Sequence, residues 1–82
     1  MPEQIKIELK RVAVAVAEMM SFDLAASRLG MTTSEVQDQI DELESILCLR
    51  IFSPGADPPK ITDEGHFLLK SFKEALERDG RV

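Results

Sequence analysis

Residues 32–44 read TTSEVQDQIDELE, and this stretch decides the fold because it predicts an amphipathic helix with a defined start. Thr32 stands three residues before Glu35, the spacing of a capping box, in which each side chain accepts a hydrogen bond from the backbone of the other residue. Apolar side chains then recur at intervals of four, three and four residues, as one face of a helix requires; they are Val36, Ile40, Leu43 and Leu47. We expect this helix to end at about Cys48.

The solvent side of this predicted helix is acidic, and it carries Glu35, Asp38, Asp41, Glu42 and Glu44. No Lys or Arg occurs between Met31 and Leu49. The chain holds 15 acidic and 10 basic residues, so these five acids account for its whole net charge of −5. Like charges three or four residues apart on a helix repel, each pair by about 0.2–0.5 kcal/mol. A positively charged partner explains such a face better than the alternative, a surface that is merely solvated.

Two further helices are predicted before this one. Residues 5–20 carry apolar side chains at helical spacing on one face. Ser21 is a suitable N-cap for a short helix over residues 22–29, and Gly30 can end it because glycine readily adopts positive φ. Two helices joined by a short turn that contains glycine are typical of a helix-turn-helix.

A small hairpin and a last helix are predicted after residue 48. Residues 49–53 and 60–62 are expected to be short strands, and the proline-rich residues 54–59 form the turn between them. Thr62 would cap a helix over residues 63–80 that ends at Gly80. The expected fold is mainly α: a winged helix-turn-helix with a three-helix core, a short two-stranded wing and a C-terminal linker-type helix. All 82 residues form one domain, with the helix-turn-helix and wing in 1–62 and the last helix in 63–80.

The apolar seam of the last helix, Leu69, Phe72 and Leu76, can pack on its own domain or form a dimer helix with a second copy. The chain has no Trp and no Tyr. We therefore expect its aromatic core to use all four phenylalanines, Phe22, Phe52, Phe67 and Phe72.

The order of the framework residues resembles a known family over roughly residues 9–69. The residues that carry the resemblance are Val12–Glu18, Ser21–Phe22, Ala25–Met31, Val36, Gln39–Ile40, Leu43–Glu44, Leu49–Phe52 and Ile61–Gly65. Together they resemble the N-terminal winged helix-turn-helix domain of LysR-type transcriptional regulators. The resemblance implies a homodimer formed through the last helix, with the helix of residues 32–48 set in the major groove of DNA.

The departures from this family concern its cations. Asp38 and Asp41 occupy positions where the family is frequently basic, and Pro54 replaces an arginine. Residues 55–57 read GAD where the wing of the family has Gly-Arg, and Cys48 stands where the family usually has glycine. Few groups are left that could hydrogen-bond to phosphates or bases. The DNA-binding candidates are Arg28, Thr32, Thr33, Ser34, Gln37 and Lys60.

Other classes of protein find little support in this chain. No catalytic constellation, phosphate-binding loop or metal-ligand pattern stands out, so we expect no enzyme, no cofactor and no metal site. Cys48 alone cannot form an internal disulfide, and no apolar run approaches the length of a membrane helix, so a cytoplasmic protein is expected. Two hypotheses follow: a LysR-type regulatory module with weak or altered DNA binding, or a non-DNA-binding adaptor or antagonist whose acidic helix binds a basic protein surface.

Overall fold

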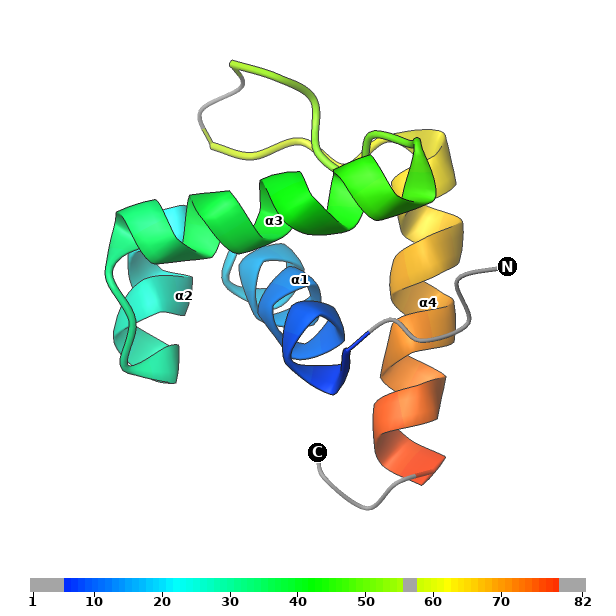
Figure 1. The fold of residues 1–82 in the computed structure, drawn as a ribbon, viewed down its shortest axis with the longest axis horizontal. Helices are drawn as coiled ribbons and strands as arrows, with labels where there is room; N and C mark the ends of the chain where they lie inside the picture. The colour runs from blue at the N-terminus through cyan, green and yellow to red at the C-terminus, as the bar shows by residue number, and fades with distance from the viewer. Residues whose placement is uncertain (1–5, 56–57, 79–82) are drawn as a thin grey trace.

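The computed structural model describes residues 6–55 and 58–78, and within them the chain forms four helices (Figure 1). These are α1 (Ile7–Met19), α2 (Phe22–Leu29), α3 (Thr33–Leu47) and α4 (Asp63–Arg78). The helix α1 packs against each of the other three, and α2 also packs against α3. In Figure 1, α3 crosses above α1, with α2 and α4 on opposite sides of it. None of these described helices is long and apolar enough to cross a membrane.

The predicted helices form, and α2 and α3 begin and end where expected, whereas α1 is shorter than the predicted 5–20: Lys6 precedes it and Met20 ends it with positive φ. The hydroxyl of Ser21 accepts a hydrogen bond of 3.1 Å from the N–H of Leu24, which caps α2. Gly30 ends α2 with φ at +69°, a backbone conformation that costs glycine little. Both bonds of the capping box are present at the start of α3. The predicted end of the last helix at Gly80 lies outside the described residues.

The core lies where α1 meets the other helices and the start of the 50–62 loop. Leu43, Ile51, Val16 and Val36 are the largest fully buried side chains. Ala25 and Ala26 of α2 are also buried, and their small side chains allow a neighbouring helix to approach closely.

Two expectations about apolar residues need correction. Phe67 does not join the aromatic core: it is 81% exposed, because it lies on the side of α4 opposite the buried stripe. Leu69, Phe72 and Leu76 are themselves that buried stripe, at 8%, 4% and 4% exposure, so they are not available as a dimer surface. Leu69 and Phe72 belong to the core cluster that also contains the buried residues of α1, against which α4 packs.

The predicted wing strands do not form as strands in the described part of the 50–62 loop, which leaves out residues 56–57. One isolated antiparallel bridge pairs Phe52 with Ile61. The N–H of Ser53 donates to the carbonyl of Lys60 at 2.8 Å, and the N–H of Thr62 donates to the carbonyl of Ile51 at 2.9 Å. A longer ladder lacks donors, because proline has no N–H and because the N–H groups of Ile51 and Phe52 bond to Glu44 instead.

The start of α4 is fixed against this loop. The hydroxyl of Thr62 accepts a hydrogen bond of 2.9 Å from the N–H of Gly65 and donates to the carbonyl of Arg50. Gly65 is buried, and any side chain there would collide with the backbone carbonyl of Ile51. The absence of a Cβ therefore lets α4 pack directly on the loop that follows α3.

Candidate recognition surface

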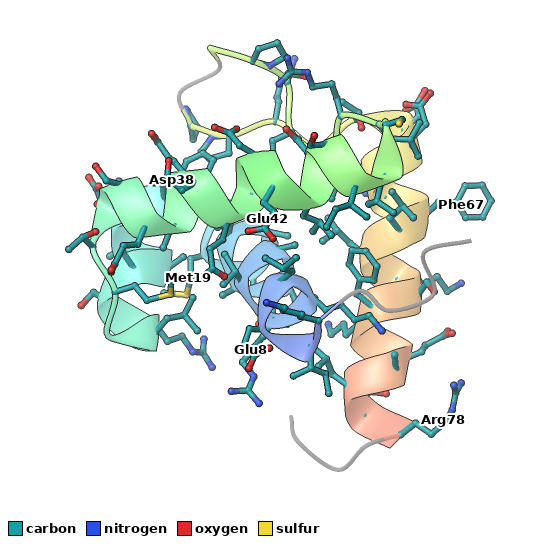
Figure 2. The ribbon with its side chains drawn as sticks, in the orientation of Figure 1. Glu8, Met19, Asp38, Glu42, Phe67 and Arg78 are labelled. Carbon is teal, nitrogen blue, oxygen red and sulfur yellow. The ribbon has the colours of Figure 1, made fainter. Side chains whose placement is uncertain are left out.

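The outward side of α3 carries four exposed carboxylates, on Glu35, Asp38, Asp41 and Glu42. Asp38 and Glu42 are labelled on this helix in Figure 2. From Glu35 to Glu42 the helix rises by about 10 Å, so one negative charge occurs on average about every 3.5 Å along its axis. A single strand of B-DNA carries its phosphates at about the same axial spacing, 3.4 Å. The outward side of α3 therefore carries about as many negative charges per unit length as one strand of DNA, and about half as many as the duplex.

Glu44 does not belong to this exposed surface, contrary to the prediction. Its side chain is 8% exposed and turns toward the 50–62 loop. One carboxylate oxygen accepts the N–H of Ile51 at 2.8 Å and the N–H of Phe52 at 3.0 Å. The other oxygen lies 3.4 Å from the guanidinium of Arg50. Glu44 therefore ties α3 to the start of the 50–62 loop, and the guanidinium of Arg50 offsets its charge.

The two threonines among the DNA-binding candidates are already engaged within the chain. The hydroxyl of Thr32 accepts the N–H of Glu35 at 3.1 Å, and the carboxylate of Glu35 accepts the N–H of Thr32 at 2.9 Å. The hydroxyl of Thr33 donates to the carboxylate of Asp23 on α2 at 2.8 Å. The two hydroxyls therefore stabilise the helix-turn-helix, and a ligand would have to compete with these internal hydrogen bonds.

The other candidates are exposed but belong to different elements. Ser34 and Gln37 lie on α3, Arg28 lies near the end of α2, and Lys60 lies in the 50–62 loop. The guanidinium of Arg28 donates weakly to the sulfur of Met19 at 3.6 Å. The two candidate cations, Arg28 and Lys60, thus stand on separate elements, α2 and the 50–62 loop.

A groove of about 550 Å³ lies between α3, the start of α2 and the 50–62 loop. Gln37 and Asp41 of α3 line it, together with Phe22 and Asp23 of α2 and Phe52 of the loop. The rings of Phe22 and Phe52 meet edge to face, with centroids 5.9 Å apart. The sequence did not identify this groove, because the residues that line it come from three separate segments.

The comparison with known proteins identifies the class. Residues 7–66 match the model of the bacterial regulatory helix-turn-helix protein, lysR family, which covers more than half of the chain. The chain therefore belongs to the LysR family of helix-turn-helix proteins.

Individual relatives agree with this assignment. The transcriptional regulator BenM of Acinetobacter baylyi is 40% identical over 57 residues, which are 70% of this chain and 19% of BenM. The transcriptional regulator MetR of Buchnera aphidicola subsp. Schizaphis graminum is 34% identical over 74 residues, which are 90% of this chain and 24% of MetR. The chain thus spans about a fifth to a quarter of the length of these relatives.

Solved structures show the same fold on DNA. The DNA-binding domain of BenM in complex with catB site 1 DNA superposes with a TM-score of 0.90 at 31% identity, covering 94% of this chain and 83% of that one. The DNA-binding domain of CbnR in complex with DNA superposes with a TM-score of 0.88 at 26% identity, covering 94% of this chain and 88% of that one. The architecture of a LysR-type DNA-binding domain is therefore present, and the charge on α3 sets this chain's recognition surface apart from a basic one.

Proposed function

We propose that this chain is a transcription-regulatory LysR-type module whose own DNA binding is weak or altered because its recognition helix is acidic. The observation that carries the proposal is the row of exposed carboxylates on α3. Affinity for DNA comes mainly from Lys and Arg groups that neutralise phosphates and release counterions. Dissolved salt screens charges over about 8 Å at physiological ionic strength, and carboxylates inside a groove of DNA lie within that distance of phosphates, so they would still repel them. A cytoplasmic location, and the use of the 50–62 loop as a wing, belong to the same proposal.

Fluorescence anisotropy of a generic labelled duplex, titrated at several salt concentrations, tests this proposal. We expect feeble binding by the natural chain. The double substitution Asp38→Lys with Asp41→Lys should bind more tightly and steepen the dependence of log K on log salt by about two. The matched control is Glu74→Lys with Glu77→Lys on α4, which makes the same change of charge at the same spacing. Equal binding by the natural chain and the α3 variant would contradict the proposal.

The second candidate function is an adaptor or antagonist that does not bind DNA and instead binds a basic protein surface. The like-charge neighbours on α3 favour it, because their repulsion is relieved when a cationic surface covers them. DNA-binding proteins carry such basic patches. A LysR-type DNA-binding domain, such as that of BenM, is the probe for a calorimetric titration. Binding that is lost in the α3 double variant and kept in the α4 control supports the adaptor, particularly if DNA binding is absent at low salt.

We also propose a homodimer through α4, using its exposed face in place of the buried stripe. Phe67, Ser71, Glu74 and Arg78 recur at intervals of four, three and four residues and are all exposed. Figure 2 shows Phe67 and Arg78 projecting from α4 on the same side, away from α1. An antiparallel pair of these helices would set Phe67 beside Arg78 of a second copy, where a cation–π contact contributes about 0.5–1 kcal/mol.

Sedimentation velocity across a range of protein concentrations tests the dimer. Phe67→Ser should shift the chain toward the monomer, whereas Leu24→Ser, which changes an apolar residue that is 53% exposed on α2, should not. A monomeric natural chain at every concentration, or a dimer indifferent to Phe67→Ser, would count against this surface.

A further inference from the structure

We propose that the groove between α3, the start of α2 and the 50–62 loop receives an arginine side chain of a basic partner protein. The inference rests on the second proposed function, binding to a basic protein surface, and adds where the partner is held and by which kind of residue. Three features of the groove support it: its free carboxylates, its aromatic lining and its net charge.

The carboxylates of Asp23 and Asp41 stand on opposite elements of the groove, α2 and α3, and both residues are exposed. Among the described residues, neither carboxylate has a Lys or Arg within ion-pair distance. One oxygen of Asp23 accepts the hydroxyl of Thr33 at 2.8 Å, which holds this carboxylate in place and leaves its second oxygen available. A guanidinium offers five N–H donors in a fixed plane and can bond to carboxylates on two sides.

The aromatic lining favours a guanidinium over an ammonium group. Phe22 and Phe52 both line the groove. Phe52 is buried and supports the half-buried ring of Phe22 by an edge-to-face contact, so Phe22 is the ring that a ligand can reach. Arginine stacks on aromatic rings and is more weakly hydrated than lysine, so it loses less hydration when it enters such a site. We therefore expect the groove to prefer arginine.

The net charge of the groove selects a cationic protein segment over nucleic acid. Its charged lining residues are Asp23, Asp41, Glu44 and Arg50, three acids and one base, which leaves a net charge of −2. The pairing of Glu44 with Arg50 shows that a guanidinium fits beside a carboxylate at this surface. The acidic outer side of α3 adjoins the groove and would repel a phosphate backbone, whereas it attracts the flanking cations of a basic segment.

Octa-arginine and octa-lysine peptides are the probes, titrated at low salt into the ¹⁵N-labelled chain and followed by amide chemical shifts. We expect octa-arginine to bind about two- to fivefold more tightly than octa-lysine, with shifts concentrated at residues 22–23, 37–41 and 52–55. Asp41→Asn should weaken octa-arginine binding by about two- to fivefold, and Asp23→Asn, which keeps an acceptor for Thr33, should do the same. Glu77→Gln, at an exposed position of α4, is the matched control and should leave binding unchanged. Phe22→Leu should bring the arginine-to-lysine ratio close to one, and the dispersion of its amide spectrum verifies that it folds.

The outcomes separate the groove from the function on which it rests. If both peptides bind equally and shift residues of α3 without shifting residues 22–23 and 52–55, the groove assignment is overturned while the basic partner stands. If Asp41→Asn changes nothing, the groove assignment is likewise overturned. If neither peptide binds even at low salt, both the groove and the basic protein partner are overturned.

Discussion

The helices α3 and α4 have nearly the same length, 15 and 16 residues, and each buries an apolar stripe, but their outer sides differ in charge. The outer side of α3 exposes only acidic charges. The outer side of α4 mixes signs, with Lys70, Lys73, Glu74, Glu77 and Arg78 all exposed. Lys73 lies 3.4 Å from Glu18 of α1, an exposed pair that contributes little to stability.

The charge difference between the exposed sides of α3 and α4 helps to distinguish residues that folding requires from residues that binding requires. Acidic and basic side chains mixed on one helix side keep it soluble and form weakly favourable pairs three or four residues apart, and α4 has this mixture. The α3 helix meets the same packing demands yet lacks a single compensating cation on its outer side. Folding therefore explains the inner sides of both helices, and the outer side of α3 requires a reason beyond the fold.

The largest effects should come from the inner sides, where the two helices are alike. Leu43→Ala on α3 and Phe72→Ala on α4 each remove a side chain of the core and should lower the free energy of unfolding by about 2–5 kcal/mol. Urea denaturation measures both. Leu24→Ala, at an exposed position of α2, is the control and should change stability by less than about 0.5 kcal/mol. A small loss for Leu43→Ala would show that α3 is not anchored as described.

The next effect distinguishes the two glutamates near the end of α3. Glu44→Ala should cost about 2–3 kcal/mol, because the N–H groups of Ile51 and Phe52 lose their acceptor in a buried place. Glu42→Ala removes an exposed carboxylate and should change stability by less than about 0.5 kcal/mol. Thermal or urea unfolding of the pair gives the comparison. Similar values for both glutamates would mean that Glu44 does not secure the loop.

A smaller effect concerns the start of α3. Thr32→Ala removes one half of the capping box and should lower the free energy of unfolding by about 1 kcal/mol. Ser34→Ala, two residues further along and exposed, is the matched control. Urea denaturation of both variants measures the difference, and a Thr32→Ala variant as stable as the Ser34→Ala variant would rule out a stabilising cap.

The smallest effect bears most directly on the outer sides, because its sign should differ between them. Asp38 has acidic neighbours at Glu35, Asp41 and Glu42, so Asp38→Asn should stabilise the chain by about 0.5 kcal/mol at low salt. Glu74 has Lys70 and Arg78 four residues away on either side, so Glu74→Gln should destabilise the chain by a few tenths of a kcal/mol, roughly. Unfolding at low and high salt tests this, and both differences should shrink as salt screens the charges. A stabilising Glu74→Gln would remove the contrast between the helices.

Local rules in the sequence predicted the helices and their caps correctly. The capping hydrogen bonds of Ser21, Thr32 and Glu35 each join residues three apart in the sequence, so the residue types within one helical turn are enough to predict them. Which side chains are exposed on the surface was harder to predict. Glu44 lies at the edge of the helical stripe, and the N–H groups that bury it stand seven and eight residues later in an irregular loop.

Phe67 and the groove show the same limit in different ways. A scarcity of aromatic residues suggested that Phe67 is buried, but its position along α4 places it on the side opposite Leu69 and Phe72. The groove joins Asp23 of α2 to Asp41 of α3 and to the loop, and such a meeting of distant segments depends on how helices pack. The spacing of apolar residues within one helix does not predict how separate helices and loops are arranged around such a groove.

The row of carboxylates on α3 has a consequence for the speed of encounters. Its charges are close together, of one sign and close to solvent, so their field extends beyond the surface and orients an approaching cationic protein before contact. Such steering can raise association rate constants from about 10⁵–10⁶ to 10⁸–10⁹ M⁻¹ s⁻¹ at low salt. Exposed charge pairs add little to the lifetime of a complex. For the basic protein partner that we propose, we therefore expect fast association and fast release, with an association rate that falls steeply as ionic strength rises.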